Sequence, residues 1–161
     1  MLRIRKNVFE TNSSSSHSIT IPHPNELNWN EMDINEDGYI EVSLGKFCHG
    51  DHESQNDRLA WLIQLIVNEK LSYNAFWYYR DKDEWETLAE QLYATEEFQE
   101  LEAEIADYAD CSGIRLSPRT EGYIDHSSNY DSMKSFLLEY DVSAVSFVFG
   151  EGVVMNFEFN G

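Results

Sequence analysis

The spacing of apolar residues changes twice along this chain of 161 residues, and that change constrains the fold more than any other feature. Near both ends apolar and polar residues alternate, as in strands with one solvated face, whereas in the middle apolar residues recur at helical spacing. The order predicts a single α+β domain over residues 1–161, with an antiparallel sheet from the N- and C-terminal segments covered by a helical middle. The expected regions are β-rich 1–50, helical 54–110, and β-rich with one helix 113–161.

The alternation and the turn residues between the alternating runs locate the strands. Strands are expected at Leu2–Phe9, Ser18–Pro22, Met32–Ile34, Tyr39–Val42, Gly113–Leu116, Gly122–Asp125, Val142–Phe149 and Val153–Phe159. Asn35–Gly38 predicts a hairpin turn, and Gly150–Gly152 joins the last two strands in the clearest hairpin pattern of the chain.

Capping residues locate the helices. Ser54 is a plausible N-cap for a helix reaching about Arg80, which is either continuous or bent near Lys70. Thr95 is expected to cap a helix with acidic residues in its first turn and on its outer face. Two more helices are expected at Asp83–Tyr93 and Asp131–Tyr140.

The charge balance limits the classes of partner. Thirty acidic and 11 basic residues give a formal net charge of −19, so direct nucleic-acid binding, which depends on Lys and Arg, is not expected. The charge instead favours a partner protein with a basic surface, or mimicry of nucleic acid in a DNA-binding groove. The alternative interpretation is an ordinary solvated acidic surface.

Neither a signal peptide nor a membrane-spanning segment is expected in this sequence. Charges interrupt the first apolar residues, and no apolar stretch reaches the roughly 18 residues of a membrane span. Cys48 and Cys111 form neither a CxxC motif nor a disulfide framework. A cytoplasmic protein with reduced thiols and no membrane contact is therefore expected.

The serine run that ends on His17 is the first candidate site. A turn that satisfies its own backbone donors is one interpretation. The other is a cradle for anionic oxygens, with His17 as acid or base. Its binding residues would be Asn12, Ser13, Ser14, Ser15 and Ser16.

The second candidate is the segment Gly122–Ser128. Asp125 could orient an imidazole, His126 could serve as acid or base, and Ser127 adds a hydroxyl. The alternative is a strand end that caps the next helix. If the two segments are adjacent, catalytic His17, Asp125 and His126 would line a pocket that binds a nucleotide or another phosphorylated ligand, with or without hydrolysis. No cofactor is expected.

Other motifs are weaker. Cys48–His52 contains possible metal ligands without a common zinc spacing, and Asp33–Asp37 matches only the first half of a calcium loop, so no metal site is predicted. The aromatic stretch Phe76–Tyr79, with Trp61 and Trp85, lacks flanking basic residues and is expected at the helix core and rim.

The segment Asn7–Ser18 resembles the opening of a family of bacteriophage and Firmicute prophage proteins, whose members begin with a "VFETNSSSSHS"-type phrase. Gly122–Ser127 and Lys70–Tyr73 resemble later phrases of the same family. The resemblance implies a phage-type origin, and hence the host cytoplasm, but no mechanism. Two functions remain open: a phosphate-ligand site, with or without catalysis, and an acidic inhibitor of a host or defence factor.

Overall fold

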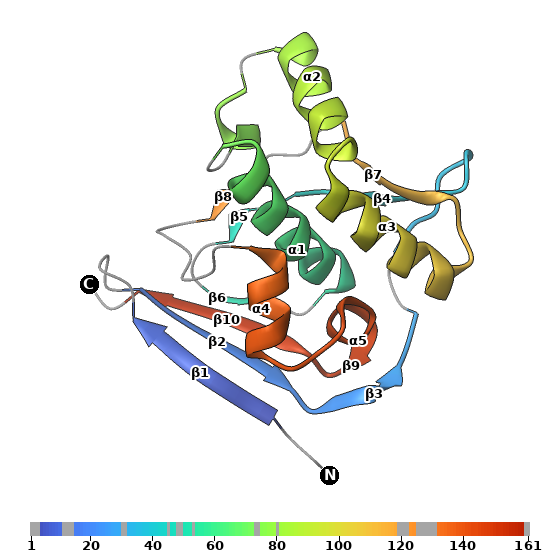
Figure 1. The fold of residues 1–161 in the computed structure, drawn as a ribbon. Helices are drawn as coiled ribbons and strands as arrows, with labels where there is room; N and C mark the ends of the chain where they lie inside the picture. Colours follow the sequence, from blue (N-terminus) through green and yellow to red (C-terminus); the bar gives the residue numbers. More distant parts are fainter. Residues whose placement is uncertain are drawn as a thin grey trace.

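The structure is a computed structural model that describes residues 4–10, 15–29, 32–44, 46–47, 50–52, 54–72, 75–79, 81–118, 123–124 and 132–159. It confirms the α+β class, since strands from both ends of the chain form a sheet and helices make up the middle (Figure 1). None of the helices in these ranges has the length and apolar character needed to span a membrane.

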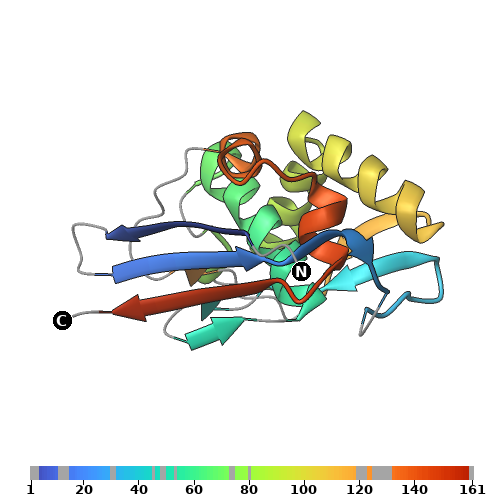
Figure 2. The ribbon, with the colours of Figure 1, turned by 90° about the horizontal axis from the view of Figure 1, so that it is seen from below.

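The main sheet is antiparallel and joins the two ends of the chain. Its order is β1 (Ile4–Glu10), β2 (Ser15–Ile21), β10 (Val154–Phe159) and β6 (Gly50–His52), as Figure 2 shows from below. Ile19, Ile21 and Met155 from the two central strands are almost fully buried in the core. β2 begins three residues earlier than expected, because the backbone from Ser15 onward pairs with β10.

Three short pairs complete the β structure. β3 (His23–Leu27) pairs antiparallel with β9 (Gly150–Glu151). β4 (Tyr39–Val42) and β7 (Gly113–Leu116) run parallel, as do β5 (Lys46–Phe47) and β8 (Tyr123–Ile124). These parallel pairs were not part of the sequence-based expectation.

The turn of the expected hairpin before β4 is confirmed. Ile34 forms an antiparallel bridge with Ile40. The Asn35 side-chain oxygen accepts hydrogen bonds from the N–H groups of Asp37 and Tyr39, both at 3.0 Å. Gly38 has a φ of +85°, which glycine adopts readily. The Asp-Gly pair is therefore explained by the turn.

Helix α1 (Gln55–Lys70) is the centre of the molecule. The expected cap is confirmed, because the Ser54 hydroxyl accepts a hydrogen bond from the N–H of Asp57 at 3.0 Å. Its residues are buried all round from Leu59 to Val67, since it packs against α2, α3, α4, α5 and β4. The helix ends at Lys70, and only a short 3-10 turn, η1 (Ala75–Trp77), follows before the next helix.

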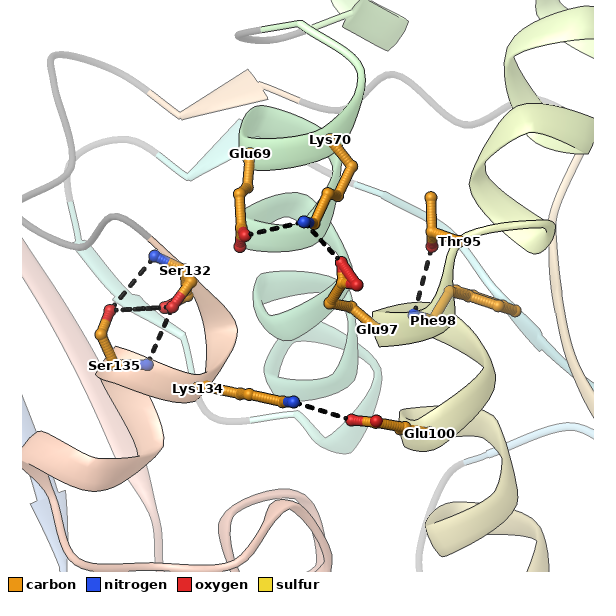
Figure 3. Close-up of polar contacts among 9 residues, drawn as sticks. All are labelled: Glu69, Lys70, Thr95, Glu97, Phe98, Glu100, Ser132, Lys134 and Ser135. Atoms are coloured by element: carbon orange, nitrogen blue, oxygen red, sulfur yellow. Dashed lines mark hydrogen bonds and ion pairs between the residues drawn. The ribbon is translucent and has the colours of Figure 1, made fainter.

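Three further helices lie near their expected positions. They are α2 (Lys82–Tyr93), α3 (Glu96–Ala109) and α4 (Met133–Glu139). Thr95 caps α3 as expected, by accepting a hydrogen bond from the N–H of Phe98 at 3.2 Å. Ser132 and Ser135 form a reciprocal capping box at the start of α4 (Figure 3).

The strand expected at Val142–Phe149 is wrong, because Ala144–Phe149 is a helix, α5. The Ser143 hydroxyl caps it by accepting a hydrogen bond from the N–H of Ser146 at 3.0 Å. Phe147, Val148 and Phe149 are all buried, as in a helix surrounded by α1, α3 and β3. The hairpin expected between this segment and Val153–Phe159 therefore does not exist, and β9 pairs with β3 instead.

Candidate functional site

The structure describes only part of the predicted serine and histidine site. Ser15, Ser16 and His17 belong to β2, where the backbone of His17 pairs with Phe9 on one side and Phe157 on the other. The backbone of Ser16 pairs with Glu10 and Glu158. The remaining predicted residues, Asn12, Ser13, Ser14, Asp125, His126 and Ser127, lie outside the described residues.

The two halves of that predicted site adjoin different sheets. β2 is in the four-stranded sheet, whereas β8, which immediately precedes Asp125, pairs with β5. Nothing in the described ranges brings Ser15–His17 and β8 together as strand neighbours. The Ser/His/Asp pocket therefore stays a prediction.

The segments considered for metal binding offer no assembled ligand set. The Asn35 side chain is engaged by its own turn. Cys48 and His49 lie outside the described residues, and Asp51 and His52 belong to β6. In the ranges that the structure covers, no three His, Cys, Asp or Glu residues gather as a metal-binding group.

The strongest surface feature is acidic. Residues 81–110 contain twelve acidic residues and a single basic one, Lys82. They form α2 and α3, which lie on the side of α1 away from the four-stranded sheet (Figure 1). We define the α2–α3 acidic face by its exposed carboxylates: Asp83, Glu84, Glu86, Glu90, Glu96, Glu100, Glu104 and Asp107.

Two lysines from neighbouring helices hold one flank of α3 (Figure 3). Lys70 of α1 lies 2.9 Å from Glu97 and 3.2 Å from Glu69, and Lys134 of α4 lies 3.1 Å from Glu100. The hydrogen bond to Glu97 is the largest of the effects that raise the pKa of Lys70, and Glu100 raises the pKa of Lys134. These ion pairs connect α3 to α1 and α4 at the surface of the protein.

Arg115 forms a second internal ion pair beneath the same helices. Its guanidinium lies 2.7 Å from the Glu102 carboxylate and over two rings, 4.2 Å from the centroid of Tyr39 and 4.6 Å from that of Tyr93. Glu102 also accepts a hydrogen bond from the N–H of Ile114 at 2.9 Å. These contacts connect α3 to β7 and β4 and use Arg115 and Glu102 within the fold.

A pocket of about 520 Å³ lies at one end of the acidic face. Its lining comes from the start of α2, from the segment before it and from the second residue after β7: Tyr79, Asp81, Lys82, Trp85, Glu86 and Pro118. The aromatic stretch Phe76–Tyr79 was expected at the core and rim of a helix. The core and rim positions are confirmed for buried Phe76 and exposed Tyr78, but the helix is wrong, because α1 ends at Lys70 and the stretch begins in the 3-10 turn η1. Sequence reasoning missed the pocket, because Pro118 is distant in sequence.

A second pocket, of about 400 Å³, opens beside β4. Asn56 closes one side of it with a pair of 3.0 Å hydrogen bonds to the backbone of Ser43. Asp33 and Glu41 add carboxylates without a basic residue in the lining. This pocket repeats the acidic character of the surface but lacks an aromatic wall.

Comparison of the chain with protein families, curated proteins and solved structures finds no match. Three structural features therefore bear on function: the acidic helices α2 and α3, the pocket with aromatic lining at the start of α2, and the ion pairs that connect α3 to its neighbours.

Proposed function

We propose that this protein is a non-enzymatic binding protein whose α2–α3 acidic face docks onto a basic surface of another protein. The observation that carries the proposal is the row of exposed carboxylates on two consecutive helices, in a stretch with one basic residue. Like charges gathered on two neighbouring helices raise the local potential, which speeds encounter with a positive partner and repels negative ones.

The construction of the face supports a recognition role. α3 buries Phe98, Leu101 and Ile105 in the core, so the helix is fixed while Glu96 and Asp107 stay exposed. Ion pairs with Lys70, Lys134 and Arg115 also connect it to its neighbours. A rigid presentation lowers the entropy lost on binding. The resemblance to phage and prophage proteins favours a partner in the bacterial host, such as a nucleic-acid enzyme or a defence protein with a basic groove.

The alternative, a phosphate-ligand site on the serine run, has less support from the described backbone. β2, which carries Ser15–His17, belongs to the four-stranded sheet, whereas β8, which immediately precedes Asp125, pairs with β5. The net charge of −19 also disfavours an anionic ligand. We therefore place the acidic face first.

The test compares two variants of equal net charge. The face variant combines Glu90→Gln, Glu96→Gln, Glu104→Gln and Asp107→Asn. The distal variant neutralises exposed carboxylates on other segments of the chain: Glu26→Gln, Asp33→Asn, Asp141→Asn and Glu151→Gln. Both are used with the unmodified protein to capture partners from host lysate, and each captured protein is identified, purified and titrated against all three chains.

The proposal expects a purified partner that binds the unmodified protein and the distal variant alike, and the face variant at least about tenfold more weakly. The affinity for the unmodified protein should fall steeply as salt is raised from about 50 to 300 mM, because salt screens exposed charges. Equal affinities for both variants, or an affinity independent of salt, would exclude the face as the contact.

A further inference from the structure

The pocket at the start of α2 differs from the rest of the acidic face because aromatic rings line it. Tyr79 and Trp85 supply the rings, and Asp81 and Glu86 supply carboxylates. Its volume of about 520 Å³ lies within the usual range for sites that enclose a side chain or a small ligand. Aromatic faces beside carboxylates are the surroundings that an organic cation prefers.

The same chain shows this chemistry already in use. Around Arg115 the guanidinium is covered by the rings of Tyr39 and Tyr93 and paired with the carboxylate of Glu102. The pocket lining offers the same kinds of group, with two aromatic residues, two carboxylates instead of one, and in addition Lys82. A planar guanidinium can stack on a ring and pair with a carboxylate at once, which an ammonium does less well.

We infer that this pocket receives an arginine side chain of the partner protein, and that it is the specific anchor of the acidic face. The inference rests on the proposed function, since it assumes a partner with a basic surface. It adds what the charge alone does not give, because exposed carboxylates attract many basic surfaces whereas a lined pocket selects one side chain.

Three charged groups of the lining set the strength of this site. The Asp81 carboxylate is held in place as the cap of α2, since it accepts a hydrogen bond from the N–H of Glu84 at 2.8 Å. Lys82 lies 3.6 Å from Glu86 in an exposed ion pair, and its positive charge competes with an incoming guanidinium. Removing that charge should therefore strengthen binding, and removing the Glu86 charge should weaken it.

The probe is the short peptide acetyl-Gly-Arg-Gly-amide, titrated into the full chain labelled with ¹⁵N. The neutral analogue with citrulline in place of arginine is the control peptide. The readout is the indole N–H signal of Trp85, assigned among the four tryptophans by its loss in Trp85→Phe. Binding to the variants is followed by the backbone N–H signals of α2, and thermal melting verifies that each variant is folded.

The expected result is a saturable shift of the Trp85 signal with the arginine peptide and none with citrulline. Trp85→Leu should weaken binding at least about threefold, whereas Trp85→Phe, which keeps an aromatic face, should retain most of it. Glu86→Gln should weaken and Lys82→Gln should strengthen binding by about twofold to threefold. Equal shifts with both peptides, or no effect of Trp85→Leu in a folded variant, would overturn the inference.

Two neighbours in sequence, Arg80 and Arg119, lie outside the described residues, so they enter the test as variants. Binding that emerges only in Arg80→Gln or Arg119→Gln would make the occupant this chain's own arginine and overturn the inference. The face variant leaves the pocket lining intact. If it binds the purified partner as well as the unmodified chain does, the proposed function fails on its own, whatever the peptide shows. If the peptide fails while the partner still distinguishes face from distal variant, only the arginine pocket fails.

Discussion

One buried polar residue, Arg58, connects the C-terminal part of this fold to the central helix α1. Arg58 of α1 is 4% exposed, and its guanidinium donates hydrogen bonds to the carbonyl of Val148 at 2.9 and 2.6 Å and to that of Val153 at 3.2 Å. Val148 is in the last turn of α5, where carbonyls lack partners within the helix. Arg58 therefore fixes the end of α5 and the start of β10 together.

Arg58→Met should lower the free energy of unfolding by about 3 kcal/mol, because it leaves two buried carbonyls without these donors. Urea denaturation monitored by circular dichroism measures the loss. Arg58→Lys is the matched control: it keeps the charge but loses the forked geometry, so an intermediate loss is expected. A loss below about 1 kcal/mol in Arg58→Met would show that the guanidinium contacts are not stabilising.

Tyr93 gives the protein a sensitivity to alkaline pH. Burial raises the pKa of its hydroxyl, and the hydrogen bond from the N–H of Leu116, at 2.9 Å, opposes that effect in part. Because the folded-state pKa exceeds the unfolded value of about 10, the contribution to stability is complete below pH 10 and is lost as pH rises through the folded-state pKa.

Tyr93→Phe should therefore reduce the loss of stability above about pH 10. At pH 7 the same variant should be about 1 kcal/mol less stable, since the N–H of Leu116 loses its acceptor. Urea midpoints measured from pH 7 to 11 test both statements. Tyr78→Phe, at an exposed position, serves as control, and an identical pH profile for the two variants would contradict the assignment to Tyr93.

At the scale of elements, local signals decided which helices could be predicted from the sequence. The caps Ser54 and Thr95 and the 3.6-residue spacing behind them are readable within a few residues, and both helices start as expected. The run Val145–Phe149 fits both the strand and the helix period over so short a length. The Ser143 cap is a local signal of the same kind and was missed, whereas the hydrogen bonds from Arg58 to Val148 join residues too distant in sequence to be predicted.

The pairing of strands that are distant in the sequence could not be predicted from local patterns either. β4 and β7 pair in parallel although α1, α2 and α3 intervene along the chain. The same holds for the candidate site. The acidic composition of α2 and α3 was predictable, because charge is a property of the residues themselves. The pocket at the start of α2 joins Tyr79 and Trp85 to Pro118 and arises only when β7 is placed beside α2 and α3.

The helical state of α5 makes a direct prediction at this scale. Ser143→Ala should destabilise the protein by about 1 kcal/mol, because the N–H of Ser146 loses its capping oxygen. Ser143→Asp should keep the stability, since aspartate is an equally good cap. Thermal melting of both variants decides the matter, and equal stability of Ser143→Ala and the unmodified protein would argue that the cap is not formed in solution.

For the whole molecule, the net charge of −19 on 161 residues opposes the compact state, and much of it lies on one face. The lysines that hold α3 offset only part of this repulsion, because Glu90, Glu96 and Asp107 lie exposed outside those ion pairs. Mobile ions screen exposed like charges once the Debye length falls to about 10 Å, near 0.1 M salt. Salt should therefore stabilise this protein.

Raising NaCl from about 10 to 150 mM should increase the melting temperature by a few degrees, which corresponds to about 1 kcal/mol for a chain of this length. The face variant should show a smaller increase than the distal variant, although the two have the same net charge, because it removes charges that lie close together. Scanning calorimetry of the three chains at both salt concentrations measures this difference. Equal slopes for the two variants would mean that the repulsion is spread over the whole surface rather than concentrated on α2 and α3. A melting temperature that falls with salt would mean that the ion pairs of Lys70, Lys134 and Arg115 outweigh the repulsion.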